Sequence, residues 1–218
     1  MRTIKVTGRG RLRLRPDMTV ITMSLTGGSD DYADTLRRSS KDTERLREVL
    51  AGLGFDRGEL KTLSFHVDTQ FESYEERGVY KQRFLGYQFF HTLKLEFLSD
   101  NELLGRVLYE LGVCPVQPEL QLSYTVRDRE AAKNALLASA VSDARSKAEV
   151  LTQAAGLRLK ELQSIDYSWG ELNLEVRPMN RSLMMAKGAA SAEEGYRLDI
   201  EPDDVEVSDT VTLIWEIE

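Results

Sequence analysis

Two side chains two positions apart, His66 and Asp68, have the residue types that most readily do chemistry. Residues two apart in a strand lie on the same face, so this imidazole and carboxylate could bind a metal ion or form a general base with its orienting acid. A solvated polar pair explains the same spacing, because two residues do not make a triad. The other histidine, His91, falls on an apolar strand face, where we expect a packed or interfacial residue. The sequence therefore predicts no catalytic residue and no metal ligand set.

The single cysteine and the glycines near the start offer no cofactor site. Cys114 has no second cysteine to pair with, which excludes an intrachain disulfide and favours an inert thiol in a reducing compartment. Gly8 and Gly10 make a G-x-G without the third glycine or the following helix of a phosphate-binding loop. We expect them to mark a bulge or bend in a strand, and we expect no cofactor.

Charge is distributed unevenly at the two ends of the chain. Four arginines at alternate positions could receive an acidic partner or a nucleic-acid backbone, although we favour a solvated strand face: Arg9, Arg11, Arg13 and Arg15. Acidic residues crowd the last segment, namely Asp203, Asp204, Glu206, Asp209, Glu216 and Glu218. We therefore expect the first and last strands to be neighbours in one sheet. The net charge of −7 and pI near 5.1 argue against a general nucleic-acid or anionic-membrane binder.

An adaptable binding surface could form where methionines and tryptophans occur late in the chain. Methionine repacks easily and tryptophan anchors interfaces, so the interface hypothesis names Met179, Met184, Met185, Trp169 and Trp215. We expect residues 177–202 to be a mobile loop that carries these methionines. We favour core filling by the aromatic residues and a tolerated loop for the methionines, with the interface as the alternative.

The clearest structural element is a long helix over residues 128–156. Asp128 suits its N-cap and Gly156 the left-handed position after its end. We expect its apolar face to comprise Leu137, Val141, Ala144, Ala148, Leu151 and Ala155, widened by Leu136 and Ala140. We expect its charged residues to form a solvated, paired face: Asp143, Arg145, Lys147 and Glu149.

Alternating and helical patterns predict strands and two shorter helices around this helix. Residues 4–15 and 19–26 read as an opening hairpin, and a helix follows, capped by Ser29 or Asp30 and ending near 52–54. Strands over 60–71 and 87–97 would pair around a turn near Arg77, with Phe65 opposite Phe89. A capping box from Ser99 to Glu102 opens the second short helix. Strands over 120–126, 159–168 and 205–217 complete the pattern, the last with a bulge near Ser208 or Asp209.

Four stretches resemble one family, the SIMPL-domain proteins. They read VTGRGRLRLRPDMTVITMSL, GYQFFHTLKLEF, DARSKAEVLTQAAGLRLKELQSI and IEPDDVEVSDTVTLIWEIE. The resemblance implies an α+β fold of interwoven antiparallel sheet units and a tendency to oligomerise. Many bacterial relatives carry a signal peptide, lie in the periplasm or outer membrane and are linked to oxidative-stress protection, and a eukaryotic member is a signalling adaptor. The given sequence shows no signal peptide, so we expect a cytoplasmic protein.

These observations predict an α+β protein over residues 1–218, a single SIMPL-type domain or two interwoven lobes. Antiparallel sheet units would carry one long and two shorter helices. We expect a non-enzymatic, homo-oligomeric scaffold or binding module, with a further protein partner, no nucleic acid, no membrane span and a role in stress protection. The alternatives are a metal-dependent hydrolase using His66 and Asp68 and a carrier of a small apolar ligand in a groove between sheet and helix.

Overall fold

The computed structural model describes residues 2–167, 174–177 and 200–218. The chain divides into two compact units. Unit 1 comprises Met1–Asp17, Thr125–Val176 and Pro202–Glu218, and unit 2 comprises Met18–Tyr124 and Arg177–Glu201. Among the described residues, each unit has its own antiparallel sheet, with one helix in unit 1 and two in unit 2, so the expected α+β class is confirmed. In the described part of the chain, no helix is long and apolar enough to cross a membrane.

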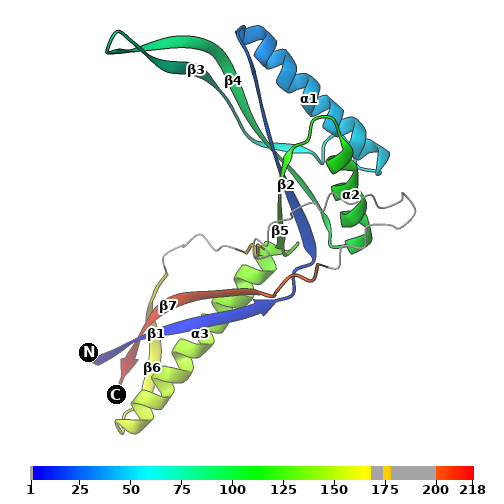
Figure 1. Cartoon of the computed structure of the whole chain (residues 1–218). Helices are drawn as coiled ribbons and strands as arrows, with labels where there is room; N and C mark the ends of the chain where they lie inside the picture. The colour runs from blue at the N-terminus through cyan, green and yellow to red at the C-terminus, as the bar shows by residue number, and fades with distance from the viewer. Residues whose placement is uncertain (1, 168–173, 178–199) are drawn as a thin grey trace. The chain divides into compact units, whose positions relative to one another are not determined.

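Unit 2 has a β-α-β-β-α-β order of elements. They are β2 (Met18–Ser29), α1 (Tyr32–Gly52), β3 (Lys61–Glu76), β4 (Val79–Leu98), α2 (Asn101–Val113) and β5 (Glu119–Thr125). The strands lie in the order β3-β4-β2-β5. This element order defines a ferredoxin-like, split βαβ unit (Figure 1).

The core of unit 2 lies between its sheet and its two helices. Alternate residues of β2 and β4 are buried because one strand face turns inward, as in Ile21, Met23, Leu25, Phe89, Leu93 and Leu95. The helices contribute residues at helical spacing: Leu46, Leu50, Leu104, Val107 and Leu111.

The helix caps of unit 2 differ from the expected ones by one residue. Asp31, rather than Ser29 or Asp30, accepts from the Asp34 N–H at 2.9 Å. Asp100 caps α2 by accepting from the Glu102 and Leu103 N–H groups, so the predicted capping box at Ser99 is wrong. A carboxylate on Asp100 is within reach of both donors, and Ser99 Oγ instead lies 3.2 Å from Thr19 Oγ1.

The β3–β4 hairpin forms, but its predicted register is wrong. Arg77 and Gly78 have φ values of 56° and 78°, which makes a two-residue turn with positive φ at both positions. Irregularities between Thr62 and Ser64 and between Gln70 and Phe71 shift the pairing. Phe65 therefore lies opposite His91, two residues from the expected Phe89. The shift is even, so the side chains keep their predicted faces.

Unit 1 contains β1 (Arg2–Leu14), α3 (Arg129–Ala154), β6 (Leu159–Asp166) and β7 (Val205–Ile217). The strand order β1-β7-β6 confirms that the first and last strands are neighbours. The opening hairpin is wrong, because β1 pairs with β7 and β2 pairs with β4. Asp17, which lies between β1 and β2, makes two hydrogen bonds. Its N–H donates to the Thr125 carbonyl, and its carboxylate accepts from the Arg127 N–H.

β7 pairs with β1 residue by residue, without the bulge expected near Ser208. Its inner face keeps one parity throughout: Val205, Val207, Asp209, Val211, Leu213 and Trp215. Asp209 breaks the apolar alternation that the sequence shows. Its carboxylate accepts a hydrogen bond from the Tyr167 hydroxyl at 2.8 Å, which satisfies a polar group on this face.

The buried stripe of α3 differs in part from the expected one. Asp128 caps the helix and Gly156 has a φ of 70°, as predicted. The buried residues follow a strict spacing of four: Ala132, Leu136, Ala140, Ala144, Ala148 and Thr152. Val141 and Leu151, expected inside, are 39% and 53% exposed. Steps of four follow a row inclined to the helix axis, so α3 lies obliquely across its sheet (Figure 1).

Gly8 and Gly10 let the backbones of β1 and α3 meet. A Cβ on Gly8 would lie 2.1 Å from the Ala140 carbonyl oxygen, and one on Gly10 would lie 2.2 Å from the Leu136 carbonyl oxygen. Neither distance is possible for a real side chain. The two glycines that suggested a bulge are therefore the points at which the helix contacts the strand.

The outer edge of β1 is covered by two charged residues of the same helix. The Arg9 N–H donates to Asp143 Oδ2 at 2.7 Å, and Lys147 Nζ lies 2.7 Å from the same oxygen and 3.4 Å from the Thr7 carbonyl. These two hydrogen bonds lower the pKa of Asp143, the Lys147 bond most. Asp143 and Lys147 form the exposed ion pair that the sequence predicts, as do Arg145 and Glu149. In addition, Asp143 and Lys147 bind the open edge of the sheet.

We expect Gly8→Ala to destabilise the protein by about 1–3 kcal/mol or more, because the new methyl group must displace the α3 backbone. Urea unfolding measures the loss. Gly52→Ala is the matched control, since a Cβ there meets nothing within 4 Å, and alanine favours the helix that Gly52 ends. Equal stability of the two variants would contradict the contact.

Candidate interaction surface

His66 and Asp68 lie side by side in β3, as their spacing predicts. His66 Nε2 is 3.9 Å from Asp68 Oδ2, and both side chains are more than half exposed. The imidazole stacks on Phe90, with ring centroids 4.9 Å apart. Among the described residues, no group of three or more His, Cys, Asp or Glu is placed to hold a metal ion. The pair thus has the geometry of a surface contact.

His91 is held by hydroxyl groups on both sides of its ring. Nδ1 lies 3.3 Å from Ser39 Oγ and 3.2 Å from Thr43 Oγ1, both on α1, and Nε2 lies 2.9 Å from Thr62 Oγ1. Burial, and then the charge of Arg47, lowers the pKa of His91. His91 is therefore a packed residue that links α1 to the sheet.

This environment makes stability depend on pH. The folded protein binds a proton at His91 less readily than the unfolded chain, so stability should fall as pH drops through the ordinary histidine range, from about pH 8 to pH 5. We expect His91→Gln to lessen that fall, measured as unfolding midpoints across the range. His66→Gln removes an exposed imidazole from the same sheet and is the control variant. An unchanged slope in His91→Gln would refute this role.

The remaining candidate residues lie in ordinary structural positions. Cys114 is buried at 3% exposure, as an inert thiol would be. Arg9, Arg11 and Arg13 alternate on the exposed face of β1, and Arg15 follows its end. Arg13 pairs with Asp204 at 2.7 Å, so one acidic partner of this strip is in the same chain.

The predicted methionine and tryptophan surface lies mostly outside the described residues. Met179, Met184, Met185 and Trp169 fall there, as do residues 178–199 of the expected loop 177–202. Trp215 is 6% exposed and packs with Ala140, Ala144 and Ala148 in the core of unit 1. Its position favours core filling.

The β3–β4 hairpin, which we name the ribbon, exposes many large apolar side chains. Both strands run past the rest of their sheet (Figure 1), because Ser29 at the end of β2 pairs with Tyr87. Residues 79–86 of β4 therefore have only β3 as a strand neighbour in the described chain. The exposed residues are Leu63, Phe65, Phe71, Tyr74, Val79, Tyr80, Phe84 and Leu85.

Three aromatic rings on one face of the ribbon and one from α1 form a continuous series of contacts, and we name this set of four the aromatic ladder. Tyr32, in the first turn of α1, contacts Tyr87 at 5.3 Å between centroids; Tyr87 contacts Phe84 at 5.2 Å; and Phe84 contacts Phe71 at 5.8 Å. These edge-on contacts extend the core face of the sheet beyond the helix that covers it. Tyr32, Phe84 and Phe71 are 50%, 45% and 53% exposed.

The other face of the ribbon is largely ionic. Arg83 pairs with Glu72, and Lys81 pairs with Glu76. The ribbon is therefore two-sided, with the aromatic ladder on one face and cross-strand ion pairs on the other. Its outer strand, β3, is also the edge of the sheet and is 16 residues long.

The sequence patterns did not predict this surface. They indicated two strands, over 60–71 and 87–97, joined by a turn near Arg77, and not the longer strands that form the ribbon. The signal was the density of aromatic residues on both sides of that turn, at Phe71, Tyr74, Tyr80, Phe84 and Tyr87. Apolar residues at alternate positions indicate a strand face, but they do not show whether anything covers it.

The fold defines a two-unit α+β protein in which a ferredoxin-like unit carries an extended ribbon. A family model described as "SIMPL: Protein of unknown function (DUF541)" matches residues 4–215. The chain therefore belongs to the SIMPL family, which confirms the resemblance seen in its sequence.

No curated protein matches the chain. Among solved structures, the de novo designed protein Ferredog-Diesel is similar over 51% of this chain and 88% of its own, with 16% identity and a TM-score of 0.21, too weak a likeness to support an inference.

Proposed function

We propose that this chain is a non-enzymatic scaffold or binding module that works as a homo-oligomer, and that the ribbon joins its copies. The observation that carries the proposal is the aromatic ladder. Monomeric proteins rarely expose contiguous large apolar patches, and aromatic residues are enriched where proteins bind one another. In this proposal the assembly, rather than a bond-making site, supplies the protective role that the family resemblance implies.

A second copy of the chain suits the ribbon for electrostatic reasons. Between residues 61 and 85, the acidic residues Asp68, Glu72, Glu75 and Glu76 are balanced by the basic residues Lys61, Arg77, Lys81 and Arg83. The whole chain has a net charge of −7, so two copies repel one another in general. The formal charges of the ribbon sum to zero, so it adds nothing to that net repulsion.

The geometry of β3 also suits a second copy. A long edge strand leaves backbone N–H and C=O groups free to pair with another strand. Two identical edges can pair antiparallel about a two-fold axis, the commonest symmetry of homodimers. Such pairing would place aromatic ladders from two chains on one continuous sheet.

A metal-dependent hydrolase using His66 and Asp68 is the second candidate. Its support is the shared strand face and the 3.9 Å separation. Among the described residues, no group of three or more His, Cys, Asp or Glu includes the pair, so the scaffold has the stronger support.

The proposal predicts that replacing Phe71 and Phe84 together by glutamate dissociates the assembly. Buried carboxylates in an aromatic contact are unfavourable, so light scattering should give the 24.7 kDa mass of one chain for the variant and a multiple of it for the wild type.

The control is Tyr74→Glu, which adds one carboxylate to the ionic face of the same ribbon, where Tyr74 lies opposite Lys81. It should assemble as the wild type does, and circular dichroism should show that both variants are folded. A wild-type mass of one chain at all concentrations, or an assembled Phe71→Glu/Phe84→Glu variant, would overturn the proposal.

A further inference from the structure

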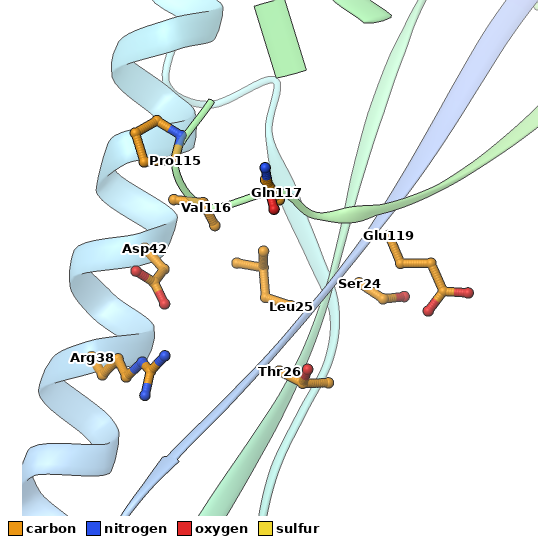
Figure 2. A pocket seen from close by; sticks show the side chains of 9 residues that line it. All are labelled: Ser24, Leu25, Thr26, Arg38, Asp42, Pro115, Val116, Gln117 and Glu119. Atoms are coloured by element: carbon orange, nitrogen blue, oxygen red, sulfur yellow. The ribbon is translucent and has the colours of Figure 1, made fainter. Parts of the chain in front are cut away.

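A small hollow lies in unit 2 between α1, β2 and the segment that joins α2 to β5 (Figure 2). Its volume is about 220 Å³, the scale of one small metabolite rather than of a lipid or a peptide. It is separate from the aromatic ladder and contains none of its residues. Ser24, Thr26 and Gln117 line it with hydroxyl and amide groups.

The hollow exists because β5 is shorter than the strand it accompanies. β5 has 7 residues and β2 has 12, and the Thr125 carbonyl at the end of β5 accepts from Asp17, just before β2 begins. β5 therefore covers only the first part of β2. In the described chain, the later part of that edge faces the hollow instead of a strand.

Two opposite charges from α1 face this opening. Arg38 and Asp42 are one helical turn apart, and Figure 2 shows both side chains extending from the helix toward β2. Arg38 Nη1 donates to the Gly28 carbonyl at 3.1 Å, which orients the guanidinium, and its other N–H groups make no hydrogen bond to any residue that the structure describes. Asp42 is half-buried and forms no ion pair within the described residues.

The loop that closes the hollow has an unusual backbone. Gln117 has a φ of 46°, in the left-handed region that non-glycine residues seldom adopt, and its N–H donates to the Cys114 carbonyl. Such strained residues tend to occur at ligand-binding sites. Here the turn brings Val116 and Gln117 to the rim of the hollow.

We propose that this hollow binds a small zwitterion of the α-amino-acid type. Arg38 holds its carboxylate through charge-assisted hydrogen bonds, and Asp42 holds its ammonium group. Ser24, Thr26 and Gln117 supply further polar contacts, and Val116 contacts the apolar part of the ligand. A simple anion fits less well, because the carboxylates of Asp42 and Glu119 repel it.

The test is calorimetric titration of the full chain with four probes: glycine, L-serine, L-glutamine and L-leucine. We expect at least one to bind, and Arg38→Gln and Asp42→Asn each to weaken its binding by about tenfold or more. The N-acetyl and amide derivatives of that probe, which lack the ammonium or the carboxylate charge, should also bind more weakly.

Lys41→Gln is the control, because it removes a charge from an exposed position on the same helix outside the hollow. It should bind the probe as the wild type does. Absence of binding by all four probes would overturn the proposal, as would wild-type affinity in folded Arg38→Gln and Asp42→Asn variants or equal binding of both derivatives.

Discussion

The difference in length between β4 and β2 determines which apolar residues of unit 2 are exposed. β4 has 20 residues and β2 has 12, so β4 continues where its neighbour has ended. The helix above begins at Tyr32 and cannot cover the extra residues. The apolar face of the sheet therefore runs out into solvent as the aromatic ladder from Tyr87 to Phe71. A two-stranded ribbon is marginal by itself in water, which makes a partner for this face physically favourable.

The two units differ in whether the edge strand of their sheet is covered. In unit 1, Gly8 and Gly10 bring α3 against β1, and Asp143 and Lys147 then bind the Arg9 N–H and the Thr7 carbonyl. The edge of β1 is thereby closed by its own helix. In unit 2, β3 is a longer edge strand with mostly exposed residues, and it carries the ribbon. The edge of β1 is thus covered within the chain, whereas the edge of β3 is open to pairing. This difference is what the proposed assembly through β3 requires.

Sequence patterns predicted local structure well and long-range packing poorly. The cap at Asp128, the left-handed Gly156 and the strand faces of β4 follow from residue types within a few positions. The pairing of β1 with β7 was predictable only from opposite charges, and the opening hairpin was wrong because strand neighbours depend on distant contacts. The density of aromatic residues indicates the ladder but not its exposure. That exposure and the contacts of Gly8 depend on where a helix lies over a sheet, which local patterns do not show.

Amide hydrogen exchange of the ribbon at different protein concentrations tests the central claim most directly. Backbone groups of β3 that pair with a second chain are protected only while the chains are associated. Protection of residues 63–84 should therefore increase with concentration, while that of α3 should not change. Exchange in the ribbon that is rapid and independent of concentration would contradict assembly through this surface.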